Sequence, residues 1–160
     1  AMASLRDIDG HPVIYDGNVY LISHSGRMVA VNLRSGVRLW EQSVGSADTP
    51  WVAGEFIYVV TTESEVICMT RREGRIIWIT QLERFSDPDL RKEPVQWHGP
   101  TLAGDRVIVT SSHGYALTLS PYTGEVTGGI DLPDDSSMGP IVSNATLYFL
   151  VEDGEIVAMR

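Results

Sequence analysis

A repeat of about forty residues is the feature that most limits what this chain can fold into. Its copies align on Pro12, Pro50, Pro100 and Pro140, without a gap in the core of any copy. One position of the repeat holds Tyr20, Tyr58, Ile108 and Tyr148, and a later one holds Gly26, Ser64, Gly114 and Gly154. Recurrence of this kind indicates stacked structural units rather than a single irregular core.

Each copy of the repeat reads as a series of short strands. Runs such as 18–22 and 56–60 are rich in β-branched and aromatic residues, which favour strands. Short turns with glycine separate the runs, and glycine accepts the positive φ of tight hairpins. With four strands per copy and no amphipathic helix, the sequence predicts an all-β fold. We expect a β-propeller fragment of about four four-stranded antiparallel blades, the last one incomplete.

The repeat also predicts how the chain is organised, as one propeller-type domain. We expect a linker at 1–10, a first blade at 11–48, a second at 49–98 with an inserted loop at 83–97, a third at 99–138 and an incomplete fourth at 139–160. This corresponds to half of an eight-bladed propeller. Because unpaired sheet edges promote association, we expect the fragment to self-associate and complete a ring.

Two tryptophans occupy one position in the last strand of the repeat. This recurrence indicates that Trp40 and Trp78 pack between blades. The third copy has Gly128 at this position, so its blade is expected to lack the contact and to be looser. For Trp97, which follows the insertion, core packing and an exposed surface both remain open, with core packing favoured.

Charge and composition exclude several classes of function. The net charge is -9 and no basic run occurs, which argues against a nucleic-acid binder and fits a basic protein partner. No apolar stretch approaches the length of a membrane helix. The histidines His11, His24, His98 and His113 are not at ligand spacing, so we expect no metal site. No catalytic constellation or cofactor motif is found, and the prediction is a protein that is not an enzyme.

The segment 30–40, Ala-Val-Asn-Leu-Arg-Ser-Gly-Val-Arg-Leu-Trp, resembles the repeat of quinoprotein-type propellers. Within that superfamily the chain resembles the C-terminal half of the BamB-like propeller lipoproteins, which belong to the bacterial outer-membrane barrel-assembly machinery. Three stretches carry the resemblance: the Asp-x-Asp-x-x-Pro run at 7–12, the first blade at 16–40, and the ending at 154–160.

The resemblance implies a non-enzymatic scaffold on the periplasmic side of the bacterial outer membrane, lipid-anchored in the full-length parent. Its implied partner is the periplasmic part of the barrel-forming subunit, and Asp7 and Asp9 are the implied partner-binding residues. Carboxylates before a strand also commonly satisfy turn amides, which is the competing interpretation of this pair. A second contact element of the family is absent from this chain, so we expect the chain alone to bind the barrel-forming subunit weakly.

Two other functions remain as alternatives at this stage. One is a fragment of a PQQ-dependent quinoprotein dehydrogenase, which would need a cofactor and a metal. The other is a periplasmic sensor propeller. The sequence that precedes residue 1 in the full-length protein would distinguish these alternatives.

Overall fold

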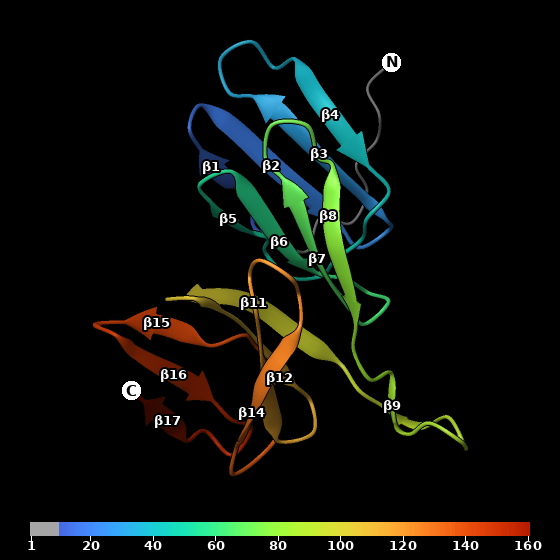
Figure 1. The fold of residues 1–160 in the computed structure, drawn as a ribbon, viewed down its shortest axis with the longest axis vertical. Helices are drawn as coiled ribbons and strands as arrows, with labels where there is room; N and C mark the ends of the chain where they lie inside the picture. Colours follow the sequence, from blue (N-terminus) through green and yellow to red (C-terminus); the bar gives the residue numbers. More distant parts are fainter. Residues whose placement is uncertain (1–9) are drawn as a thin grey trace.

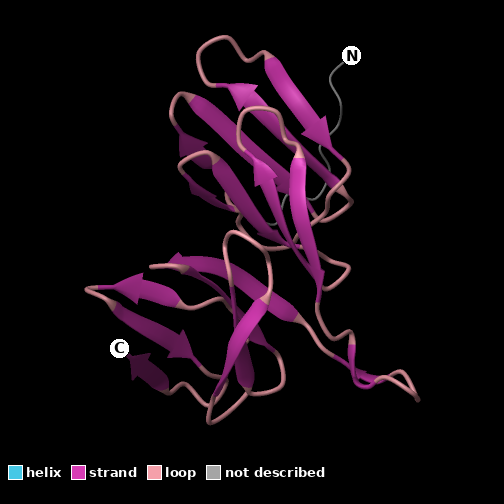
Figure 2. Cartoon of the chain, in the orientation of Figure 1, coloured by secondary structure: helices cyan, strands magenta, loops and turns pink. Residues whose placement is uncertain are grey.

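Residues 10–160, the part that the computed structural model describes, form an all-β fold without helices. Figure 2 shows strands joined by loops and turns throughout. The all-β prediction is therefore confirmed. Within this range no helix exists that is long and apolar enough to cross a membrane.

Four antiparallel sheets follow one another along the chain, each with its strands side by side in sequence order. The first sheet contains β1 (Val13–Tyr15), β2 (Asn18–Ser23), β3 (Arg27–Asn32) and β4 (Arg38–Gln42). The second contains β5 (Trp51–Ala53), β6 (Phe56–Val60), β7 (Glu65–Thr70) and β8 (Ile76–Gln81). The third contains β11 (Trp97–Ala103), β12 (Arg106–Ser111), β13 (Tyr115–Leu119) and β14 (Val126–Asp131). The fourth has three strands, β15 (Ile141–Ser143), β16 (Thr146–Leu150) and β17 (Ile156–Met159).

The sheets are stacked in chain order, with the first two in one half of Figure 1 and the last two in the other. A register shift recurs at one repeat position, between Ala30 and Val31, between Cys68 and Met69, and between Thr118 and Leu119. Bulges of this kind increase the local twist of a strand. The same backbone irregularity in three sheets shows that they are copies of one structural unit.

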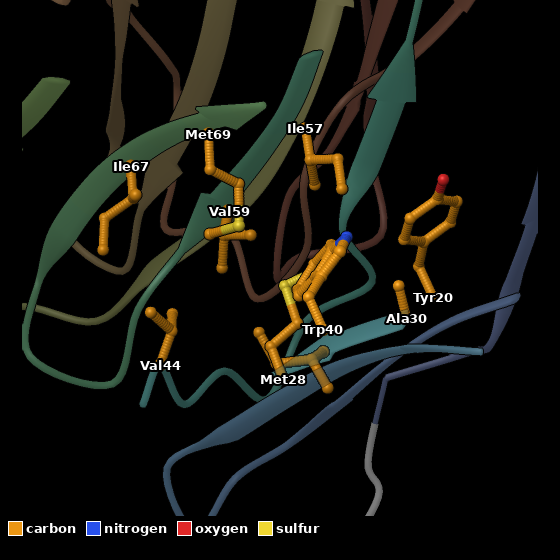
Figure 3. Close-up of a cluster of buried hydrophobic side chains, with 10 residues drawn as sticks. Tyr20, Met28, Ala30, Trp40, Val44, Ile57, Val59, Ile67 and Met69 are labelled. Atoms are coloured by element: carbon orange, nitrogen blue, oxygen red, sulfur yellow. The ribbon is translucent and has the colours of Figure 1, made fainter. Parts of the chain in front are cut away.

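Apolar side chains lie on both faces of the central strands, and the second and third sheets each pack against a sheet on either side. Figure 3 shows the cluster between the first and second sheets, with Trp40 among side chains from both. The indole Nε1–H of Trp40 donates to the carbonyl oxygen of Arg71 at 2.9 Å. Trp78 donates in the same way to the carbonyl of Pro121 at 3.1 Å. The prediction that these tryptophans pack between repeat units is confirmed.

Two glycines make room for the tryptophan rings. A Cβ on Gly74 would lie 2.6 Å from the Trp40 ring, and one on Gly124 would lie 2.5 Å from the Trp78 ring. Both glycines also have positive φ, 65° and 76°. Each ring therefore stacks directly on backbone of the next sheet, which no larger residue would permit.

The third interface, between the third and fourth sheets, lacks the tryptophan, because Gly128 stands at that position of β14. A cavity of about 480 Å³ opens there, lined by Ile108, Thr118 and Ile130 on one side and by Leu147 and Met159 on the other. The last residue, Arg160, also lines this pocket, and the looser contact remains a prediction.

The insertion forms a small hairpin of its own, β9 (Phe85–Asp87) paired with β10 (Lys92–Pro94). It projects away from the sheets in Figure 1. Trp97 is only 6% exposed, and its indole donates to the carbonyl of Glu83 at 2.8 Å. The favoured prediction of core packing for Trp97 is thus confirmed.

Candidate functional site

The turns of this fold lie on two opposite rims, since every sheet repeats the same path. The chain enters each sheet at the rim that carries the repeat prolines, here called the proline rim. It comprises residues 10–12, 24–26, 43–50, 61–64, 82–96, 112–114, 132–140 and 151–155. The opposite rim comprises residues 16–17, 33–37, 54–55, 71–75, 104–105, 120–125 and 144–145.

Acidic residues are concentrated on the proline rim. Its carboxylates are Asp48, Glu63, Glu83, Asp87, Asp89, Glu93, Asp134, Asp135, Glu152, Asp153 and Glu155, and its basic residues are Arg84, Arg91 and Lys92. The opposite rim is almost balanced, with Asp16, Glu55, Glu73, Asp105 and Glu125 against Arg34, Arg71, Arg72 and Arg75. Most of the chain's net negative charge therefore faces one side.

Few of the carboxylates on the proline rim are neutralised by an ion pair. Arg84 pairs with Glu63 at 3.2 Å, while the side chains of both remain at least half exposed. The backbone N–H of Glu152 donates to the carbonyl of Asp135 at 2.9 Å, so the pair at 134–135 lies beside the acidic turn at 152–155. Clustered, solvated carboxylates of this kind attract a basic surface and raise association rates.

Asp7 and Asp9, the sequence-predicted binding residues, lie outside the described residues. The structure does place the residues that follow them. Gly10 is buried against the connection at 43–50, where an added Cβ would lie 2.6 Å from the carbonyl oxygen of Asp48. The backbone N–H of His11 donates to Thr49 Oγ1 at 3.0 Å. The chain is thus fixed to the proline rim immediately after the acidic pair.

A pocket of about 240 Å³ opens on the proline rim beside Asp48. His24, Thr61 and Trp97 contribute to its wall, together with the pair formed by His98 Nδ1 and Asp48 Oδ2, 3.5 Å apart. Asp48 lies in the connection before the second sheet, and His98 lies in β11, the first strand of the third sheet. Their proximity was not predicted from the sequence.

Residues 10–160 contain no group of three His, Cys, Asp or Glu side chains placed to hold a metal ion. The rim offers hydrogen-bonding groups and negative charge, which suit contact with another macromolecule.

The base of the inserted hairpin is tied to the third sheet through Tyr115. Its hydroxyl donates to Glu83 Oε2 at 3.1 Å, and its ring packs edge-on against Trp97 with centroids 5.4 Å apart. Burial, and then the negative charge of Glu83, raise the pKa of Tyr115 to about 12. Tyr115 therefore remains protonated and donates this hydrogen bond across the physiological range.

The family profile and the curated relatives that match this chain carry the same name. A family profile described as outer membrane protein assembly factor BamB matches residues 1–80. The chain is 28% identical over 156 residues to outer membrane protein assembly factor BamB of Salmonella typhimurium, and 28% identical over 158 residues to that of Escherichia coli K12. Each alignment covers 97% of this chain and 38% of the relative. The chain thus spans well under half the length of these curated relatives.

Solved structures resemble the chain as well. BamB from Moraxella catarrhalis has a TM-score of 0.80 at 19% identity, covering 94% of this chain and 42% of that one. The computationally designed Ika4 protein has a TM-score of 0.77 at 9% identity, covering 99% of this chain and 94% of that one. Quinohemoprotein alcohol dehydrogenase from Comamonas testosteroni has a TM-score of 0.63 at 19% identity and is covered to 22%. At these identities the structural likeness establishes the fold alone.

Proposed function

Because this chain belongs to the BamB family of outer membrane protein assembly factors, we propose that it acts as a protein-binding scaffold in outer-membrane β-barrel assembly. The family match over residues 1–80 is the observation that carries the proposal. In this proposal the protein performs no catalysis. It works on the periplasmic side of the outer membrane, with a lipid anchor in the full-length protein.

The proposed partner is the periplasmic part of the barrel-forming subunit, which would dock on the proline rim. The charge distribution supports this choice of rim, because a basic partner gains far more from the acidic side than from the balanced one. Asp7 and Asp9 are the proposed primary contacts. In support, Gly10 and His11, the next residues, are held against Asp48 and Thr49 of this rim.

A quinoprotein enzyme is not the proposed function. The dehydrogenase likeness is a likeness of fold, at 19% identity. The family profile and the curated relatives name an assembly factor instead.

We extend the proposal to self-association of the 160-residue chain. Its first and last sheets each leave an apolar face without a neighbouring sheet in the described structure. Exposed apolar sheet faces favour association in water.

The partner proposal is tested by surface plasmon resonance, with the full-length protein binding the isolated periplasmic domains of the barrel-forming subunit. Asp7→Lys with Asp9→Lys, or Asp134→Lys with Asp135→Lys, should lower the association rate about tenfold at low ionic strength. The difference should shrink as salt screens the rim.

The matched control changes the same charge on the opposite rim, with Glu73→Lys and Asp105→Lys. These variants should retain nearly the original association rate. Equal losses from both rims would refute docking on the proline rim. Unchanged binding of the Asp7 and Asp9 variant would remove those two residues from the contact. No binding by the original protein would refute the partner itself.

A further inference from the structure

The pocket beside Asp48 is built by three successive units of the repeat. Its wall combines the turn after β2, the end of β6 with the turn after it, and the segment that leads into β11. None of its lining residues belongs to the outward faces of the first or fourth sheet. The pocket therefore lies between neighbouring units inside the stack.

A small residue in the connection before the second sheet leaves the pocket open. Ala47 lines the pocket and occupies the same repeat position as Trp97, three residues before the repeat proline. Trp97 packs edge-on against Tyr115 of its own unit. The equivalent of Tyr115 in the second unit is Glu65, which directly follows Ser64 of the pocket wall. The space that an indole fills in the third unit is therefore open beside Ala47.

A second departure from the repeat supplies a polar group. Ser46 and Ser136 occupy the repeat position of Gln96, and each donates from Oγ to the carbonyl oxygen two residues later, at 3.2 Å and 3.1 Å. The side-chain amide of Gln96 makes no hydrogen bond within residues 10–160. Gln96 and Ala47 both line the pocket. Departures from a local rule are expected at functional sites.

Asp48 gives the pocket a carboxylate with unused capacity to accept hydrogen bonds. The backbone N–H of Asp48 donates to Ser46 Oγ at 3.0 Å, which fixes the residue in its turn. Its Oδ2 lies 3.5 Å from His98 Nδ1, longer than a normal hydrogen bond, and Oδ1 has no partner in the described part of the chain. The side chain is only 28% exposed, so water reaches it incompletely. A positively charged N–H donor would stabilise this carboxylate.

The size and lining of the pocket fit a single side chain. Pockets for cofactors and drug-sized ligands have volumes of about 300–1,000 Å³, whereas this pocket has a volume of about 240 Å³. Val60, Val95 and Trp97 form an apolar part of the wall, which suits the methylene groups of a long side chain. Asp48 and the amide oxygen of Gln96 suit a guanidinium group, because its planar N–H groups can donate to two acceptors at once. An arginine side chain meets both requirements.

We infer that this pocket binds an arginine side chain of the protein that docks on the proline rim. The inference rests on the docking of a basic partner proposed above, and it adds the point at which one residue of that partner is held. Charge favours a partner as the source, because the surrounding rim carries far more carboxylates than basic side chains and attracts a basic protein surface. Arginine is also enriched among the residues that dominate the binding energy of protein interfaces.

The first test measures binding of a single arginine to the full-length protein by ligand-observed NMR. The probe is arginine capped with acetyl and N-methylamide groups, and equally capped citrulline, which has a similar shape without the charge, is its control. Capped arginine should bind at least about tenfold more tightly than capped citrulline.

Three variants locate the binding of capped arginine. Asp48→Asn should weaken it about tenfold, and Ala47→Trp, which copies the residue of the next unit, should abolish it by filling the pocket. Asp48→Asn preserves the shape of the side chain, so it decides the test if Ala47→Trp unfolds. Glu63→Gln is the matched control, because it removes the same charge from the proline rim at a side chain that is 69% exposed and outside the pocket wall. This control should bind capped arginine as the original protein does.

The second test measures binding of the same variants to the isolated periplasmic domains of the barrel-forming subunit by surface plasmon resonance. Asp48→Asn and Ala47→Trp should raise the dissociation constant at least about tenfold, mainly through faster dissociation, because a desolvated pair is lost. Glu63→Gln should change the dissociation constant less than about twofold, and through the association rate, because it alters only an exposed rim charge.

Each result bears on a separate part of the inference. Equal binding of capped arginine and capped citrulline, or arginine binding that survives Ala47→Trp, would overturn the arginine site. Partner binding that is unchanged by Asp48→Asn and Ala47→Trp would overturn the pocket as a docking point and leave the proposed function intact. No partner binding by the original protein would overturn the proposed function, and the capped arginine then decides the chemistry of the pocket.

The remaining control concerns Arg6, an arginine of this chain that lies outside the described residues. The Arg6→Gln variant should bind capped arginine as the original protein does. Tighter binding by this variant would show that the chain's own arginine competes for the pocket, and would overturn a partner as the source of the side chain.

Discussion

The interface between the first and second sheets and the one between the third and fourth sheets are built at the same repeat positions but are closed differently. At the first, Trp40 reaches across the interface and stacks on the backbone at Gly74. At the third, Gly128 stands at the tryptophan position, and an open pocket of about 480 Å³ lies between the two sheets. The face of the third sheet that meets the fourth is also more polar, with Thr110 and Thr118 in place of Ile22 and Ala30.

The repeat therefore determines the backbone, while individual side chains determine how tightly two units join. All three interfaces keep their sheets stacked, with or without the tryptophan. At the third interface, hydrogen bonds supply part of the contact, as the Thr110 hydroxyl donates to the carbonyl of Met138 at 2.7 Å. The stability of the molecule should therefore be uneven along the stack.

The strongest test of whether stability differs between interfaces is to remove the tryptophan from the first interface, so that it resembles the third. Trp40→Ala removes a large buried ring and its hydrogen bond, and should lower the free energy of unfolding by about 3–5 kcal/mol. Urea denaturation of the purified chain measures the loss. Leu39→Ala, one residue away and 47% exposed, should change stability by no more than about 0.5 kcal/mol. Similar losses for the two variants would contradict the proposed role of the ring.

A smaller loss of stability should follow when Gly74, the residue on which the Trp40 ring stacks, is replaced. Gly74→Ala forces a Cβ to 2.6 Å from the Trp40 ring at positive φ, and should cost about 2–3 kcal/mol. Gly54→Ala shares the positive φ but meets nothing within 4 Å, and should cost about 1 kcal/mol. Thermal unfolding of the two variants isolates the effect of the ring contact. If Gly54→Ala is equally costly, strain rather than packing explains the glycine.

Alkaline pH should weaken the second interface and spare the third. Burial raises the pKa of Cys68 from 9.0 to about 11 and that of Tyr58 from 10.0 to about 12. Both groups stay neutral when folded but ionise when unfolded, so stability is intact below pH 9 and falls as pH rises toward 12. The third interface has Ile108 and Thr118 at these positions, which do not titrate.

Chemical denaturation across this pH range measures the effect. Tyr58→Phe with Cys68→Ala should flatten the decline in stability relative to the original chain. A decline that is unchanged in this double variant would show that other groups are responsible.

The smallest effect is expected from closing the third interface. Gly128→Trp with Thr118→Ala places an indole in the cavity beside Ile130 and Met159, and should add about 1 kcal/mol of stability. Gly129→Trp, on the other face of the same strand, should give no gain. A double variant that is less stable than the original chain would show that this cavity cannot accept the ring.

Much of the fold follows from the sequence because the repeat is read locally. The structure of each repeat can be predicted from short stretches of sequence. These signals are the glycine turns, the alternating apolar strands and the matching positions of Trp40 and Trp78. The missing tryptophan at Gly128 is visible in the sequence for the same reason. The contact of His98 with Asp48 joins distant segments and was not predicted. The short hairpin of β9 and β10 is local, but its polar sequence indicated only a loop. The segregation of charge between the rims also became visible only when the turns were assigned to the two sides.

The proposed acidic contact illustrates what the sequence pattern alone does not show. Asp7 and Asp9 were chosen through a family resemblance, and they lie outside the described residues. No motif in the sequence singles out Asp134 and Asp135. The structure places them beside the turn at 152–155, because a backbone hydrogen bond joins Glu152 to Asp135. No local pattern in the sequence reports that contact.

The inserted hairpin has a practical consequence for protein engineering. Its stem is closed by the bond from Val95 N–H to the Arg84 carbonyl at 3.0 Å and by the anchoring of Trp97 on Glu83. Beyond that stem, the segment at 86–93 does not contribute to the three apolar clusters between the sheets. Doubling the length of a flexible loop costs only about 0.6 kcal/mol. Foreign peptides could therefore be displayed at this tip, with the stacked sheets serving as a rigid carrier.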